Sequence, residues 1–227
     1  MKAAIFQGEG AIALGGRPDP TIKEPTDAVV RVVLACVCGS DLWYYRGESD
    51  YPVGSPIGHE FLGVVEHVGE SVQNIAKGDL VIAPFFYSDG TCHHYRAGIN
   101  SACVRGGGRG VNGIDGGQGE AVRVPLTDGT LVKVPGSGHS DETVASLLTL
   151  SDVMCTGHHA AVSAEVKQGD TVAVVMRRSV CLPSLRRDVN DRGSTDQGGE
   201  KVDTLLVAWS QRAKQQWPEI TRPFHLA

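Results

Sequence analysis

The sequence lacks the features that mark a nucleic-acid-binding, membrane-spanning or secreted protein. Basic residues do not prevail, since 21 Lys and Arg stand against 26 Asp and Glu, and the formal net charge of −5 argues against binding to nucleic acid. No apolar run approaches the roughly 20 residues of a transmembrane helix. The apolar start at 1–6 is too short for a signal peptide and is typical of a first strand.

Six cysteines occur in this chain without a secretory leader. This combination predicts a reducing, cytoplasmic compartment, in which thiols serve as free groups or metal ligands rather than as disulfides. With 227 residues, of which 41% are hydrophobic, the chain has enough apolar material for one domain of about 150 residues and a smaller remainder.

Two short motifs predict a metal site. Cys-Gly-Ser-Asp at 38–41 is followed along the chain by Gly-His-Glu at 58–60, so a thiolate, an imidazole and carboxylates are available together. All three are zinc ligands in proteins, and a catalytic zinc ion is held by three of them with a fourth position left open. Cys38 and His59 would supply two of these ligands, so the third must come from elsewhere in the chain.

The residues around these motifs predict rigid supports. The almost continuous apolar run at 29–36 is typical of a buried strand that ends just before Cys38. A second strand-like run at 61–65 follows His59 directly. The Ser-Asp pair at 40–41 is typical of a helix start. Both ligands would thus lie at the ends of secondary-structure elements.

The order of the motifs resembles that of the zinc-dependent medium-chain alcohol dehydrogenases, whose catalytic half is a GroES-like β domain. The chain also contains Lys-Gly-Asp-Leu-Val at 77–81, Gly-Gly-Gln-Gly-Glu-Ala-Val-Arg-Val-Pro at 116–125 and Leu-Ser-Asp-Val-Met at 150–154. The resemblance extends over residues 1–175. It implies a fold that is mostly β with α, in which a GroES-like β-barrel catalytic domain precedes a remnant of a Rossmann α/β domain.

The resemblance also implies roles for individual residues at the zinc site. Cys38, His59 and Asp152 would be the catalytic zinc ligands, with Glu60 as an alternate ligand that approaches the metal when water leaves. Asp41 would accept a hydrogen bond from His59 and fix its ring, as metal-bound imidazoles generally require.

Three further assignments follow from the same resemblance. Ser40 would relay the substrate proton toward solvent, and Thr156 and Gly157 would pack against the nicotinamide face. Some family members have a cysteine at the third ligand position, so Cys155, three residues beyond Asp152, offers a rearranged ligand set if both share a helical face.

The family commonly binds a structural zinc ion through four cysteines on a projecting lobe. At the corresponding places this chain has Asp89, Cys92, Tyr95 and Cys103. Tyr95 is not a structural zinc ligand. His93 or His94 would be a substitute, although neither has the family's spacing. We therefore expect a lobe that binds zinc poorly or not at all, with Asp89, Cys92 and Cys103 as the residues that would hold it.

Nucleotide binding depends on a glycine-rich turn between a strand and a helix. Residues 106–119 contain eight glycines and the spacing Gly-x-Gly-x-x-Gly, but they lead into the strand-like run 120–124, so we interpret them as a loop. The helix start at 140–142 and the helical stretch 151–166 precede a buried, parallel strand expected at 169–175. No glycine follows this strand until Gly193, which predicts poor binding of NAD(P).

We therefore divide the chain into a zinc-binding catalytic domain at 1–150, a connecting helix and first nucleotide-domain strand at 151–175, and a divergent or out-of-frame, disorder-prone tail at 176–227. A strand at 172–175 without sheet partners would expose backbone groups and favour self-association.

The resemblance implies hydride transfer between a small alcohol or carbonyl substrate and NAD(P), with Zn²⁺ as the metal. As the chain stands, we expect it to be inactive. The alternative is a non-catalytic zinc-binding remnant or interaction module.

Overall fold

The computed structural model describes residues 1–109, 114–167, 173–175, 194–195, 201–202 and 204–206. The chain divides into two compact units, Met1–Cys155 and Thr156–Ala227. Each unit is described separately below.

The strands of the first unit are β1 (Lys2–Gly8), β2 (Ala11–Gly16), β3 (Ala28–Cys36), β4 (Glu60–Val68), β5 (Leu80–Ala83), β6 (Phe86–Tyr87), β7 (Gly107–Gly108), β8 (Ala121–Val124) and β9 (Val132–Lys133). Its helices are α1 (Asp41–Tyr45), α2 (His93–Arg96), α3 (Thr127–Thr130) and α4 (Asp141–Leu148), with 3-10 turns η1 (Asn100–Ala102) and η2 (Thr149–Ser151). Helix α5 (Val153–Ser163) begins just before the boundary between the units.

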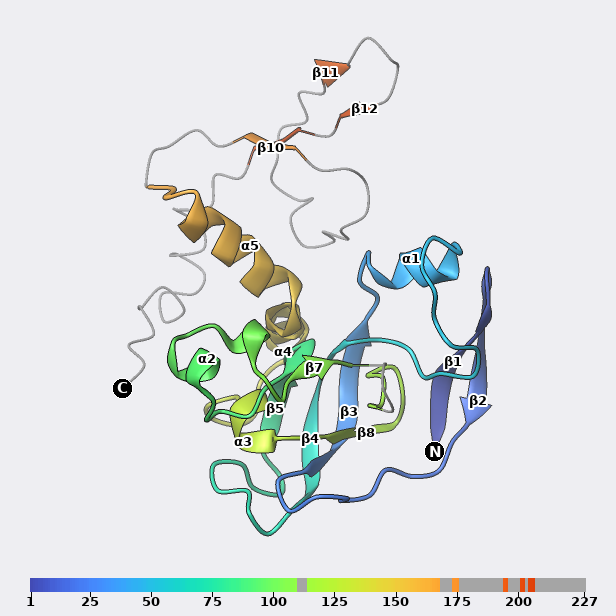
Figure 1. Ribbon diagram of the computed structural model, residues 1–227, viewed down its shortest axis with the longest axis vertical. Coiled ribbons are helices and arrows are strands. Elements are labelled where there is room, and N and C mark those ends of the chain that lie inside the picture. The colour runs from blue at the N-terminus through green and yellow to red at the C-terminus, as the bar shows by residue number, and fades with distance from the viewer. Residues whose placement is uncertain (110–113, 168–172, 176–193, 196–200, 203, 207–227) are drawn as a thin grey trace. The chain divides into compact units, whose positions relative to one another are not determined.

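A five-stranded antiparallel sheet forms the centre of the first unit, in the order β8-β3-β4-β5-β9 (Figure 1). Both of its faces are covered. One apolar cluster contains Phe61 and Val81, while their strand neighbours Leu62 and Ile82 belong to another. Because neighbouring residues of a strand point to opposite faces, these two clusters bury both sides of the sheet. The strands expected at 29–36, 61–65 and 120–124 are confirmed.

Close packing of β3 on β4 requires a glycine at position 63. A Cβ atom built on Gly63 would lie 2.2 Å from the carbonyl oxygen of Arg31 and 2.7 Å from Cγ1 of Val30. The β3–β4 register also shifts between Val32 and Leu34, beside Gly63. This strand pair matters for the site, because Cys38 follows β3 and His59 precedes β4.

An ion pair inside the protein fastens β8 to the start of β3. Arg123 donates two hydrogen bonds to the carboxylate of Asp27, at 2.6 and 3.0 Å. The Asp27 side chain is fully buried and also accepts from the amides of Lys23 and Glu24. Such a pair stabilises mainly because breaking it would leave one buried charge alone.

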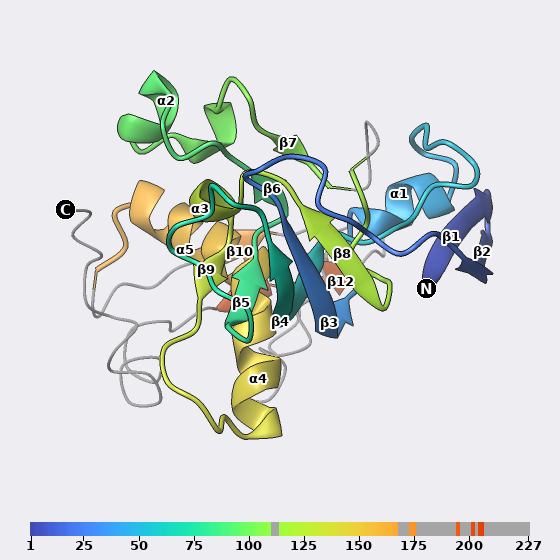
Figure 2. The ribbon, with the colours of Figure 1, turned by 90° about the horizontal axis from the view of Figure 1, so that it is seen from below.

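Helix α4 packs on one face of the central sheet, next to β3 and β4 (Figure 2). It begins as expected, since the Ser140 hydroxyl accepts a hydrogen bond from the amide of Thr143. Its Val144, Leu147 and Leu148 join the cluster that contains Leu62. The helix thereby fixes the segment that leads to η2 and Asp152.

Within the second unit, β10 (Ala173–Val175) pairs with β13 (Thr204–Leu206), and β11 (Ser194–Thr195) pairs with β12 (Lys201–Val202). Both pairs are antiparallel. The expectation of a parallel strand at 169–175 without partners is therefore wrong for residues 173–175, which pair antiparallel with β13. The rest of that strand and most of the tail lie outside the described residues.

None of the helices in the described part of the chain combines the length and the apolar content that a membrane crossing requires.

Candidate metal centre

Cys38 lies two residues beyond the end of β3 and is held by the first turn of α1. Its amide donates to the Asp41 carboxylate at 2.9 Å, and its side chain is buried. Ser40 precedes the helix but makes no side-chain capping bond. The expected Ser-Asp helix start is therefore correct in place and wrong in its cap, because the Asp41 side chain makes the bond that closes the turn.

His59 and Glu60 are positioned by the start of β4. Gly58 precedes them with φ +88°, and a Cβ atom there would lie 2.5 Å from Cγ of Gln118. Only glycine combines this backbone conformation with so close a neighbour at no steric cost. The turn at position 58 therefore directs the His59 ring toward Cys38 rather than into the sheet.

Asp41 orients the His59 ring. Its Oδ1 lies 3.1 Å from Nδ1 of His59 and accepts a hydrogen bond from the Tyr44 hydroxyl at 2.9 Å. Asp41 is itself buried, with 5% of its surface exposed. With Nδ1 engaged in this way, Nε2 is the nitrogen left to face Asp152, from which it is 3.4 Å away. This is the geometry expected of an imidazole prepared for a metal.

Asp152 reaches the same place from a distant part of the chain. It lies between η2 and α5 with φ −154° and ψ −72°, which breaks the helical path. The neighbouring Ser151 is buried, and its carbonyl accepts from the amide of Phe85 at 3.1 Å. Phe85 in turn packs edge-on against the His59 ring. The break in the helix thus places the Asp152 carboxylate beside Cys38 and His59.

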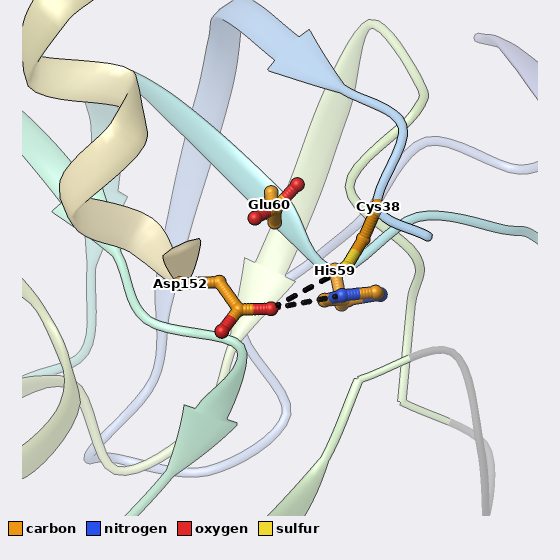
Figure 3. A group of neighbouring side chains, drawn as sticks. All are labelled: Cys38, His59, Glu60 and Asp152. Atoms are coloured by element: carbon orange, nitrogen blue, oxygen red, sulfur yellow. Dashed lines mark hydrogen bonds and ion pairs between the residues drawn. The ribbon is translucent and has the colours of Figure 1, made fainter. Parts of the chain in front are cut away.

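Cys38, His59, Glu60 and Asp152 converge, as Figure 3 shows. One ligand atom from each lies within 4.8 Å of the others. Cys155 does not join them in this structure, since its side chain is exposed and its thiol donates to the carbonyl of Leu150. The ligand set with Asp152, rather than the rearranged one, is the arrangement present here.

The distances fit a tetrahedral zinc ion. With Zn–S near 2.3 Å and Zn–N and Zn–O near 2.1 Å, tetrahedral geometry separates sulfur from oxygen by about 3.6 Å and nitrogen from oxygen by about 3.4 Å. Here Sγ of Cys38 and Oδ2 of Asp152 are 3.6 Å apart, and Nε2 of His59 and the same oxygen are 3.4 Å apart. The donor set and its spacing therefore suit zinc.

The electrostatics of the cluster favour a positive charge at this point. Burial lowers the pKa of His59, but its hydrogen bonds to Asp152 and Asp41 outweigh burial and raise the pKa to about 12. The surrounding carboxylates thus attract a cation, and a divalent metal ion carries more positive charge than a proton.

Glu60 differs from the other members of the cluster in its surroundings. It is 2% exposed and its Oε2 accepts from the Cys36 thiol at 2.9 Å. Burial raises the pKa of Glu60, and the Asp152 charge adds to the rise, while the Cys36 bond and His59 oppose it. Sequence reasoning missed Cys36. Its place two residues before Cys38 was visible, but its pairing with Glu60 depends on the β3–β4 register.

The three other predicted site residues are exposed. Ser40 lies at the surface before α1, and Thr156 and Gly157 lie on the part of α5 that belongs to the second unit.

Comparison with known proteins identifies the family. Residues 24–136 match the model of the alcohol dehydrogenase GroES-like domain. The chain is 41% identical over 180 residues to the medium chain reductase/dehydrogenase ucsI of Acremonium sp, which covers 78% of this chain and 60% of that protein. It is 37% identical over 164 residues to zinc-type alcohol dehydrogenase B of Aspergillus flavus, covering 72% and 37%. The chain belongs to the zinc-type alcohol dehydrogenase family.

A solved structure is also similar to this chain. The short chain alcohol dehydrogenase rspB of E. coli CFT073, complexed with the cofactor NADH, superposes with a TM-score of 0.62 at 28% identity, over 75% of this chain and 48% of that one. The chain spans between about a third and three fifths of the lengths of these three proteins. The match to the GroES-like domain includes Cys38, His59 and Glu60, and Asp152 lies beyond its end.

The second predicted metal site is also assembled, but incompletely. Asp89, Cys92 and Cys103 bring their ligand atoms within 4.8 Å of one another. Arg105 already binds the Asp89 carboxylate at 2.8 Å, and the amides of Thr91 and Cys92 donate to its other oxygen. The group offers three donors, and the Arg105 guanidinium already binds the carboxylate of Asp89. A structural zinc ion needs four ligands. The residues of this lobe do not fit a structural zinc ion.

Proposed function

We propose that the first unit binds one zinc ion through Cys38, His59 and Asp152 and forms the catalytic half of an NAD(P)-dependent oxidoreductase. The reaction is the interconversion of a small alcohol and the matching carbonyl compound. The observation that supports it most is the convergence of these three side chains, from three separate segments of the chain, at the separations of a tetrahedral site.

Zinc, when bound, would supply a Lewis acid to the substrate oxygen. The protein's own contribution is to hold the ligands in place. Asp41 keeps the His59 ring in the orientation that presents Nε2. Burial of Cys38 and Asp41 shields the ligands from water, which strengthens the electrostatic interactions there.

Ser40 is proposed to pass the substrate proton to solvent. Its exposed position at the start of α1, two residues beyond Cys38, suits a group that connects the centre to bulk water. Glu60 is proposed as an alternate ligand, because its carboxylate belongs to the cluster yet is tied to β3.

The cofactor assignment rests on the family. Thr156 and Gly157 are proposed to contact the nicotinamide ring, and the E. coli relative was solved with NADH. A cytoplasmic location also belongs to the proposal, since the five cysteines that the structure describes are free thiols.

One observation favours a second candidate, a zinc-binding module without hydride transfer. No glycine occurs between Val175 and Gly193, where the family's nucleotide-binding turn would follow the strand. Such a module would bind zinc through the same three ligands.

A cofactor assay separates the two candidates. The zinc-loaded chain is mixed with NADH or NADPH and a panel of small aldehydes and ketones. Oxidation of the cofactor is followed as a loss of the absorbance of its reduced nicotinamide ring. Substrate-dependent loss that disappears in Cys38→Ser supports the oxidoreductase. Zinc binding without any such loss supports the module, and failure of the chain to bind zinc contradicts both.

A further inference from the structure

The Cys36 thiol connects β3 to the one carboxylate of the metal cluster that is not among the three proposed ligands. Cys36 and Glu60 are direct partners across the antiparallel β3–β4 pair. The thiol donates to Oε2 of Glu60 at 2.9 Å. Cross-strand neighbours are held at fixed separation by the sheet, so this contact is built into the register and not left to a flexible loop.

Glu60 has little else to hold it. The residue is 2% exposed, and Oε1 has no hydrogen-bond partner in the part of the chain that the structure describes. A buried carboxylate oxygen without a partner is costly, and it is drawn toward any cation nearby. Glu60 belongs to the same cluster of ligand atoms as Cys38, His59 and Asp152. Glu60 therefore has both the position and the need to become a fourth ligand.

We propose that Cys36 is a positioning residue, whose thiol holds the Glu60 carboxylate on β3 and so keeps it off a zinc ion bound by Cys38, His59 and Asp152. The inference rests on the proposed zinc site. Its consequence is that the fourth metal position stays open for water or substrate, as a catalytic zinc site requires.

Packing is the competing explanation for Cys36, since its partly buried side chain lies against the Leu62 cluster and cysteine often serves as a small apolar side chain. The two explanations differ in what a substitution does. If the thiol only fills space, valine replaces it without effect on Glu60. If the thiol acts as a donor, serine preserves the restraint, whereas valine and alanine release Glu60 toward the metal.

The test compares zinc affinity, measured by competition with a chelator, among the full-length wild type and Cys36→Ser, Cys36→Val and Cys36→Ala variants. Cobalt(II) absorption reports the number of ligands, and circular dichroism confirms that each variant is folded. We expect Cys36→Val and Cys36→Ala to bind zinc about 10-fold more tightly, the lower end of what groups beside metal ligands usually contribute, and to change the cobalt spectrum. Cys36→Ser should stay close to wild type.

A second set of variants carries Glu60→Gln. In this background the Cys36 substitutions should no longer change zinc affinity, because the carboxylate that they release is gone. Equal affinity of wild type and both donor-free variants would overturn the inference, as would a 10-fold effect that persists with Glu60→Gln. In either case zinc binding by the wild type would leave the proposed function standing, whereas a wild type that binds no zinc contradicts the proposed function itself.

Discussion

At the scale of single residues, Asp41 links several groups around the centre. Its two oxygens meet the Cys38 amide, the Tyr44 hydroxyl and Nδ1 of His59. The Asp41 side chain thus fixes the backbone amide of Cys38 and the ring of His59, two of the proposed ligands. Removing its charge should loosen both at once.

We expect Asp41→Asn to weaken zinc binding by about 10- to 100-fold, the usual effect of losing the partner of a metal-bound imidazole. Zinc affinity measured by chelator competition checks this. Asp128→Asn is the matched control, because Asp128 accepts hydrogen bonds from the amides of Gln73 and Asn74, away from the centre. An unchanged affinity in Asp41→Asn would show that Asp41 does not orient His59.

The sequence predicted the residues of the cluster better than their surroundings. Cys38 and His59 were found because each sits beside a recognisable strand, and Asp152 because the order of motifs resembled a known family. Cys36 and the Tyr44 hydroxyl were not found. Their contacts depend on strand register and on one turn of helix geometry, which composition and spacing do not specify.

At the scale of elements, the β3–β4 pair carries the centre, and its tightest point is Gly63. Gly63→Ala should lower the free energy of unfolding by about 1–3 kcal/mol, because its methyl group would meet the Arg31 carbonyl and the strands would have to separate. Urea denaturation measures the change. Gly16→Ala is the control, since a Cβ atom there meets nothing within 4 Å. Equal stabilities of the two variants would contradict the close approach.

The ion pair between β8 and the start of β3 gives a second prediction about elements. Arg123→Ala leaves the buried Asp27 carboxylate without its cation and should cost about 3–5 kcal/mol of unfolding free energy. Arg31→Ala is the matched control, because Arg31 pairs with Glu66 at the surface and such pairs contribute about 0–1 kcal/mol. Chemical denaturation measures the loss of unfolding free energy in each variant. Equal losses would contradict a stabilising role of the buried ion pair.

Element prediction succeeded where the pattern was local and failed where partners were distant. The strand at 29–36 and the cap at Ser140 follow from residues close in sequence. The antiparallel pairing of β10 with β13 joins segments about thirty residues apart, and short apolar runs do not specify which partner they take. The apolar run at 169–175 predicted a strand, but it did not specify the direction of the partner.

At the scale of the whole molecule, zinc should stabilise the chain against unfolding. A ligand that binds only the folded state at 100 times its dissociation constant adds about 2.7 kcal/mol. Unfolding measured with buffered zinc and with a chelator should differ by about this amount in the wild type, and the difference should vanish in Cys38→Ser. An equal shift in both proteins would place the metal elsewhere.

The two clusters of possible metal ligands differ in how well they suit zinc. The Cys38 cluster has the donors and separations of a zinc site, whereas the lobe at 89–105 has three donors and an arginine on its carboxylate. We therefore expect one zinc ion for each chain.

The most direct test is elemental analysis of the purified wild type beside Cys38→Ser and Cys92→Ser. We predict about one zinc ion per chain in the wild type and in Cys92→Ser, and almost none in Cys38→Ser. Zinc that is retained in Cys38→Ser and lost from Cys92→Ser would contradict the central claim, because the metal would then occupy the lobe and not the cluster of Cys38, His59 and Asp152.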